Sequence, residues 1–104
     1  MENDSKKIPP FLQGVLWSTK IDELNLESDR VYVINQILSY GTLPMINWLF
    51  QTYPKRTIHD IFLRHPIKDY PASRFHFVKN FLLGLDKTRL NQNRYVKNSP
   101  RNLR

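Results

Sequence analysis

Proline and glycine residues divide the chain into short segments, and their spacing is the strongest constraint on its fold. The breaks fall at Pro9-Pro10, Gly41, Pro54, Pro66 and Pro71. Proline is tolerated only in the first turn of a helix and glycine weakens one, so each segment is limited to a few helical turns. Between the breaks the apolar residues recur with helical spacing. The sequence therefore predicts an all-α fold, a compact single domain of four to five short helices.

Local signals give each expected helix its ends. A short first helix is expected to begin at Pro10 and to end at Trp17 as an anchor. A second is expected from a cap at Ser28 or Asp29 up to Gly41, whose glycine would supply a left-handed stop.

The third expected helix follows a Thr42 cap with Pro44 in its first turn, and it is apolar around most of its circumference. Such a helix is predicted to lie at the centre of the domain. The apolar face of the fourth helix is expected to be Ile58, Ile61, Phe62 and His65. After Pro71, the inner stripe of a fifth is expected to be Phe75, Val78, Phe81, Leu82 and Leu85.

Charge separates a predicted domain from a predicted tail. The 104 residues hold 16 Lys and Arg against 9 Asp and Glu, a net charge of +7. Residues 85–104 hold six of the basic side chains and one acidic side chain, with Tyr95 as their one aromatic residue. Such a segment is not expected to supply a core. We expect a flexible lead at residues 1–8, a helical domain at 9–84, and a basic, flexible tail at 85–104.

Composition excludes several classes of protein. The chain has no cysteine, which rules out disulfide frameworks, thiolate zinc sites, iron–sulfur clusters and cysteine nucleophiles. No apolar run approaches the roughly 18 residues needed to cross a bilayer, and the polar start lacks the apolar core of a signal peptide. The sequence therefore predicts a cytoplasmic protein without a membrane partner.

Candidate catalytic groups are few and scattered. The three histidines, His59, His65 and His76, form no short ligand pair. One acidic cluster spans residues 22–29, where negative charge suits a helix N-terminus. The three glycines form no phosphate-binding loop. We therefore expect no catalytic residue, no cofactor and no metal site, and a small toxin effector or nuclease is the least favoured hypothesis.

Two surfaces are candidates for binding. The aromatic residues exceed what the predicted core needs, and some of them are expected to face a protein partner. The expected partner-facing residues are Tyr70, Arg74 and Phe77. The alternative is nucleic acid, with residues 42–65 as a helix-turn-helix and a tail that holds phosphates and stacks Tyr95 on a base. The residues expected to act in this alternative are Lys55, Arg56, Arg64, Lys87, Arg89, Arg94, Tyr95, Lys97, Arg101 and Arg104.

The order of anchors resembles a small bacterial family of unknown function, over about residues 9–85. The residues that carry the resemblance are Pro9-Pro10-Phe11-Leu12, Leu16-Trp17, residues 21–26, residues 29–41, Ile46-Asn47-Trp48-Leu49-Phe50, Tyr53, residues 58–63, and Asn80-Phe81 with Gly84. Members of this family are often encoded beside nucleotidyltransferase-like toxins of the abortive-infection type. The resemblance implies a non-enzymatic, antitoxin-like partner of such a toxin, and a DNA-binding regulator is the alternative.

Overall fold

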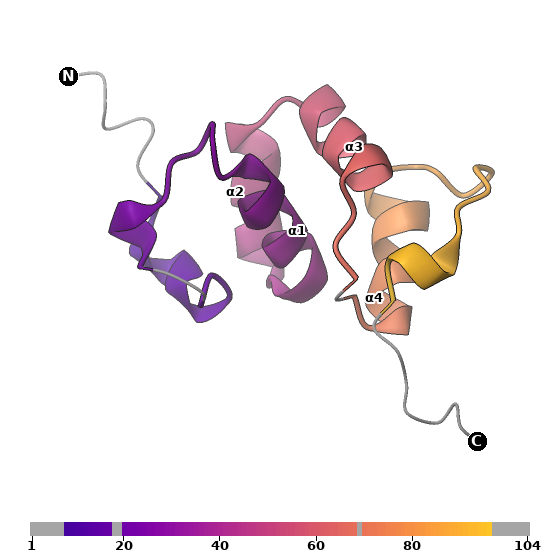
Figure 1. Ribbon diagram of the computed structural model, residues 1–104, viewed down its shortest axis with the longest axis horizontal. Coiled ribbons are helices and arrows are strands. Elements are labelled where there is room, and N and C mark those ends of the chain that lie inside the picture. The colour runs from indigo at the N-terminus through magenta and orange to yellow at the C-terminus, as the bar shows by residue number, and fades with distance from the viewer. Residues whose placement is uncertain (1–7, 18–19, 69, 97–104) are drawn as a thin grey trace.

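The computed structural model describes residues 8–17, 20–68 and 70–96, which fold as a small all-α domain (Figure 1). The helices are α1 (Arg30–Tyr40), α2 (Leu43–Thr52), α3 (Lys55–Arg64) and α4 (Ala72–Phe77). Single 3-10 turns lie at Pro10–Gly14, Ile21–Glu23 and Gln92–Arg94, and a π-helical turn at Val78–Leu82 continues α4. The predicted fold class is confirmed.

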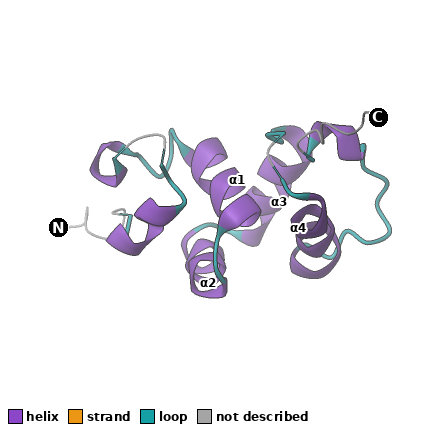
Figure 2. Cartoon of the chain, turned by 90° about the horizontal axis from the view of Figure 1, so that it is seen from below, coloured by secondary structure: helices purple, strands orange, loops and turns teal. Residues whose placement is uncertain are grey.

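Helix α1 is the centre of the domain. It contacts α2, α3 and α4, and both views place it between the N-terminal segments and α4 (Figures 1 and 2). Residues 33–39 of α1 are all buried. The prediction that the third helix would be central is wrong. Helix α2 lies along one side of α1, so it buries Ile46 and Leu49 and leaves Leu43 70% exposed.

Two buried side-chain amides of α1, those of Gln36 and Asn35, form hydrogen bonds to the segments on either side of the helix. The Gln36 side chain donates to the Val15 carbonyl at 2.7 Å, on the N-terminal side. The Asn35 side chain donates to the His65 carbonyl at 2.9 Å, where α3 ends, and accepts from the Tyr70 hydroxyl at 3.0 Å. Because buried polar groups must be paired, these bonds fix how both flanks attach to α1.

The C-terminal end of α1 differs from the predicted left-handed stop. Gly41 has a φ of −70°, which any residue adopts. A Cβ atom at this position would lie 2.6 Å from the Ile37 carbonyl oxygen, so the close approach of the backbone requires the glycine. The predicted side-chain cap is absent, because the Asp29 carboxylate makes no capping bond to α1. The predicted Thr42 cap is confirmed, since its hydroxyl accepts from the Met45 N–H at 3.5 Å.

The π-helical turn after α4 changes which side chains enter the core. The Leu83 N–H donates to the Val78 carbonyl at 2.9 Å, five residues back. One extra residue in the turn shifts the following side chains by about 100° around the helix axis. Phe75 and Val78 are buried as predicted, but the prediction for Phe81 is wrong. Leu83 is 2% exposed and takes the inner place, while Phe81 is 78% exposed.

Both ends of the described chain contribute to the core. Tyr95 is 1% exposed, and its ring lies 4.7 Å from that of Phe62 and 4.9 Å from that of Phe75, between centroids. Its hydroxyl donates to the Phe62 carbonyl at 2.8 Å. Ile8 is also buried. The prediction that residues 85–104 supply no core is wrong, because one large aromatic side chain anchors this polar segment. Residues 1–7 and 97–104 of the expected lead and tail lie outside the described residues.

Candidate functional site

Tyr70 was expected to face a partner, and the structure places it in the core instead. It is fully buried, and its ring packs edge-on against Phe62 at a centroid distance of 5.8 Å. Burial raises the pKa of the Tyr70 hydroxyl well above its ordinary value, so this group acts as a neutral donor to Asn35. The partner-facing assignment of Tyr70 is therefore wrong.

Arg74, the second expected partner residue, joins α4 to the end of α1. Its guanidinium donates to the Leu38 carbonyl at 2.9 Å and to the Gly41 carbonyl at 3.0 Å. Burial lowers the pKa of this guanidinium from its ordinary value. The last carbonyls of a helix lack partners within it and carry partial negative charge, so a cation suits this position. Arg74 therefore holds the corner between α1 and α2.

An aromatic surface occupies that corner. Trp17 is 57% exposed, and its ring lies 5.1 Å from that of Tyr40 at the end of α1. The exposed Leu43 begins α2 three residues later. We call Trp17, Tyr40 and Leu43 the Trp17 corner. The sequence predicted Trp17 as an anchor of the first segment, and its exposure was missed because nothing in the pattern shows which side of an anchor is covered.

The third expected partner residue, Phe77, is exposed. Its ring lies 6.1 Å from that of Phe81 across the π-helical turn. Phe77 is 36% exposed, and together with the more exposed Phe81 it forms what we call the Phe pair.

The expected nucleic-acid residues fall into three groups. Lys55, Arg56 and Arg64 are exposed on α3, which follows α2 after the two residues Tyr53-Pro54. The exposed basic residues of the C-terminal segment are Lys87, Arg89 and Arg94. Tyr95 is buried and does not present its ring for stacking, so that assignment is wrong. The residues outside the described part of the chain are Lys97, Arg101 and Arg104.

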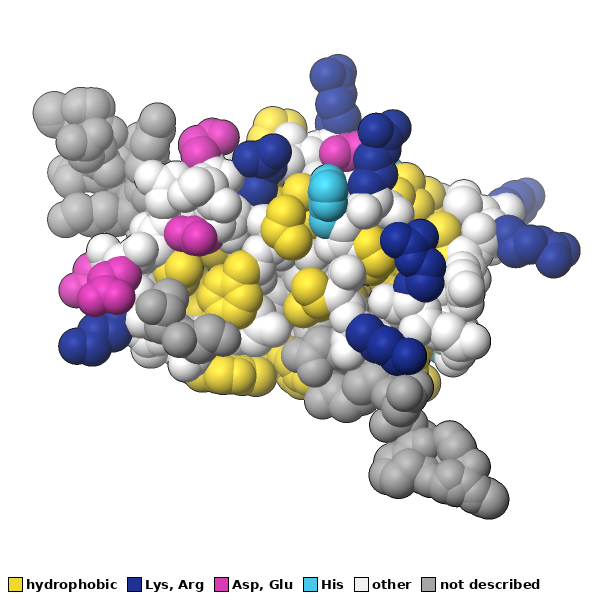
Figure 3. All heavy atoms as spheres, in the orientation of Figure 1, with side chains coloured by type: hydrophobic (Ala, Val, Ile, Leu, Met, Phe, Trp, Pro, Cys, Tyr) yellow, Lys and Arg dark blue, Asp and Glu magenta, His cyan; other side chains and the backbone are white. Residues whose placement is uncertain are grey.

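The charges of residues 8–96 separate into two halves. Residues 8–54, the acidic half, hold four Asp and Glu against two Lys and Arg. Residues 55–96, the basic half, hold nine Lys and Arg against three Asp and Glu. Acidic side chains gather at the end of the molecule formed by the N-terminal segments, and basic ones lie over α3, α4 and the C-terminal segment (Figure 3).

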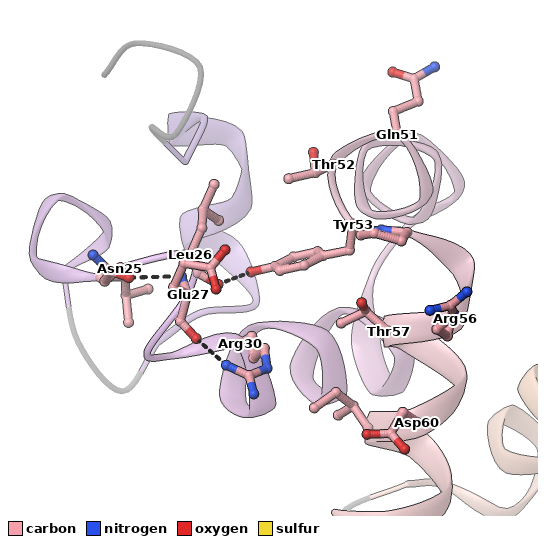
Figure 4. A pocket seen from close by; sticks show the side chains of 13 residues that line it. Asn25, Leu26, Glu27, Arg30, Gln51, Thr52, Tyr53, Arg56, Thr57 and Asp60 are labelled. Carbon is pink, nitrogen blue, oxygen red and sulfur yellow. Dashed lines mark hydrogen bonds between the residues drawn. The ribbon is translucent and has the colours of Figure 1, made fainter. Parts of the chain in front are cut away.

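A cavity of about 910 Å³ lies where residues 24–30 meet the end of α2 and the start of α3 (Figure 4). Tyr53 reaches across it, and its hydroxyl donates to the Leu26 carbonyl at 2.8 Å. Burial raises the pKa of this hydroxyl well above its ordinary value. The charged residues of the lining are Glu27, Arg30, Arg56 and Asp60. Two of these four side chains are acidic and two are basic, so their formal charges balance.

The positions of the histidine and acidic side chains do not test the prediction that the chain has no catalytic residue. Among the residues that the structure describes, no group of three or more His, Cys, Asp or Glu side chains is placed to hold a metal ion. The Nε2 atom of His59 is buried and makes no hydrogen bond. His65 was expected on the apolar face of its helix, but it is exposed just after α3 ends, and His76 is exposed on α4. In the described part of the chain, no helix is both long and apolar enough to cross a membrane.

Comparison with known proteins places the first three helices in a family. The model of DUF6922, a family of unknown function, matches residues 11–62. The chain therefore belongs to this family. The match is shorter than the expected resemblance over residues 9–85: it contains the whole Trp17 corner and ends within α3, before the Phe pair. No curated protein and no solved structure matches the chain.

Proposed function

We propose that this chain is a protein-binding module, the antitoxin-like partner of a nucleotidyltransferase-type toxin, and that it docks through the Trp17 corner. The exposure of the Trp17 side chain is the observation that carries the proposal. The hydrophobic core is complete without this ring, so its exposed area is available to a partner. Exposed tryptophans are common anchors of protein interfaces because they bury a large area at a small entropic cost.

The corner is held rigidly, which favours tight binding. The ring of Trp17 rests on Tyr40, and Arg74 fixes the backbone beneath that residue through the Leu38 and Gly41 carbonyls. A surface that is ordered before binding loses little conformational freedom on docking.

Charge supports a toxin of this class as the partner. A nucleotidyltransferase handles nucleotide phosphates, so its active-site cleft needs cationic groups. The acidic half, which carries the Trp17 corner, has the complementary charge. Opposite charges steer two proteins together and fix their orientation. Docking of the acidic half over the cleft would block access of substrate, which is how we expect the chain to inhibit the toxin.

The test is co-expression of the chain with the protein encoded next to it, followed by pull-down and a growth assay. We expect a complex and rescue of growth with the native chain. Trp17→Ala should weaken the complex by at least about tenfold, as expected for an interface anchor. Phe81→Ala is the matched control, because it removes an exposed aromatic ring from the basic half and should leave the complex unchanged.

The possible results distinguish a wrong binding surface from a wrong function. A complex that is insensitive to Trp17→Ala and Leu43→Ala would show that the corner is the wrong surface. Absence of both a complex and growth rescue would overturn the proposed function. Circular dichroism of each variant confirms that lost binding does not reflect lost helix.

A further inference from the structure

The Phe pair is an exposed aromatic surface within the basic half, and the proposed function does not use it. The two rings lie 6.1 Å apart with an angle of 32° between their planes. Phe77 ends α4 and Phe81 lies in the π-helical turn that follows, whereas Val78 and Leu83 of the same segment are buried. The π-helical geometry keeps Phe81 outside, so its exposure follows from the backbone and not from the rotamer of a loop side chain.

The backbone that follows the π-helical turn is bonded to Lys79, which lies between Phe77 and Phe81 in the sequence. The Leu85 N–H donates to the Lys79 carbonyl at 2.7 Å, and the Lys79 ammonium donates to the Asp86 carbonyl at 3.4 Å. These bonds hold the start of the C-terminal segment against the π-helical turn, which carries Phe81 and directly follows Phe77. The next basic residues of that segment, Lys87 and Arg89, are exposed.

We propose that the basic half binds a single-stranded nucleic acid, with bases stacked on Phe77 and Phe81 and phosphates held by Lys87 and Arg89. Aromatic rings next to a positively charged surface are the usual components of sites for single strands, because every base has a face that can stack. The excess of nine basic over three acidic residues in this half supplies the attraction for phosphates. Binding at such a site depends little on sequence.

The exposed face of α3 favours a single strand over a duplex. A helix that enters a duplex groove presents its outer face to bases and flanking phosphates. On α3 this face carries the Asp60 carboxylate, which is 49% exposed and pairs with Arg64 at 3.0 Å. A carboxylate there repels the phosphates on both sides of a groove. It also pairs with the Arg64 guanidinium, which is then less available to a phosphate. In a duplex, the bases are also stacked within the helix and unavailable to the Phe pair.

The experiment measures the affinity of the full chain for a fluorescein-labelled oligothymidylate by fluorescence anisotropy, over a series of KCl concentrations. A labelled duplex of the same length is measured in parallel. We expect binding of the single strand that weakens steeply with salt, and weaker binding of the duplex at every concentration. Phe81→Ala should weaken single-strand binding about tenfold through lost stacking.

Matched variants distinguish stacking from charge. The double variant Lys87→Ala with Arg89→Ala should lower both the affinity and the slope of its dependence on salt, whereas Phe81→Ala should lower the affinity alone. Phe11→Ala and Lys20→Ala are controls, because both residues are exposed on the acidic half. Neither control should change the affinity.

Three results would overturn the proposal. The first is no detectable binding of the oligothymidylate at low salt. The second is duplex binding that equals or exceeds single-strand binding, which would favour α3 in a groove. The third is single-strand binding that Phe81→Ala leaves intact while the folded state, measured by circular dichroism, is unchanged. None of these results depends on the toxin partner.

Discussion

The acidic and basic halves of this domain share one core but present opposite charges and different aromatic surfaces. Helix α1 serves both halves: Gln36 pairs with the N-terminal side and Asn35 with the end of α3. The residues matched by the family model lie mostly in the acidic half and extend into α3, whereas α4 and the C-terminal segment lie beyond them. The buried residues around α1 therefore specify the fold. The surface charges of the two halves do not take part in this core, so each half can bind a different partner.

The largest effect is expected where the C-terminal segment enters the shared core. Tyr95→Ala removes a buried ring between Phe62 and Phe75 and should lower the free energy of unfolding by about 3 to 5 kcal/mol. Trp48→Ala on α2 should cost less, because Trp48 is only half-buried. Urea denaturation followed by circular dichroism measures both.

Tyr95→Phe is the control for this prediction. It keeps the ring and removes the hydroxyl that donates to the Phe62 carbonyl, so it should cost about 1 kcal/mol. If Tyr95→Ala were no more costly than Tyr95→Phe, the ring would not be part of the core, and the basic half would not share it.

The sequence predicted the ends of helices where these are set by residues close in the chain. The breaks at Gly41, Pro54 and Pro66 bound α1, α2 and α3 closely, because caps and proline act within one turn. The sequence could not predict the π-helical turn, which inserts one residue into the helical repeat. As a result Leu83 is buried at the place where Phe81 was expected. It also could not show that Tyr95 reaches Phe62, since contacts between residues far apart in the chain leave no periodic signal.

The candidate sites were harder to predict than the fold. The surplus of aromatic residues was visible in the sequence, but which ring stays exposed depends on how the helices pack. Phe77 remained outside as expected, whereas Tyr70 became part of the core. Arg74 looked like a surface cation because a single sequence does not show that the carbonyls of Leu38 and Gly41 approach it.

The second largest effect is expected at Arg74, which joins α4 in the basic half to the corner of the acidic half. Arg74→Met should lower the free energy of unfolding by about 2 kcal/mol, because the Leu38 and Gly41 carbonyls lose charged donors. Arg74→Lys should restore little of this, since one ammonium lacks the planar fork of the guanidinium. Arg89→Met, at an exposed position, is the matched control. Equal stabilities of the Arg74→Met and Arg89→Met variants would show that the two halves are not joined there.

A smaller effect is expected from glycines of the acidic half. Gly41→Ala should cost about 1 to 3 kcal/mol, because the new Cβ atom would lie 2.6 Å from the Ile37 carbonyl oxygen. Gly14→Ala has no atom within 4 Å of its new Cβ atom and should be neutral or stabilise the fold by up to about 1 kcal/mol. Thermal unfolding of the two variants compares them directly. A Gly41→Ala variant as stable as the native chain would mean that α1 and α2 can separate without cost.

The smallest change in stability is expected at Asp60, where charge pattern can be separated from net charge. The ion pair of Asp60 with Arg64 is exposed, so Asp60→Asn should change the free energy of unfolding by less than about 0.5 kcal/mol. Asp22→Asn, at an exposed position in the Ile21–Glu23 turn, makes the same change in net charge on the acidic half and does not line the cavity that Asp60 lines. Charges act over a screening length of roughly 8 to 10 Å at ordinary salt, so only the substitution on the basic half acts at short range on a strand bound there.

We therefore expect Asp60→Asn to raise the affinity for the oligothymidylate by a few fold, and Asp22→Asn to leave it nearly unchanged, in the same anisotropy assay. Higher salt should reduce the difference, because screening weakens the contribution of each charge. Equal gains from both substitutions would mean that net charge alone attracts the strand. In that case the division of charge between the two halves would have no role in binding, and the basic half would not be a defined surface for nucleic acid.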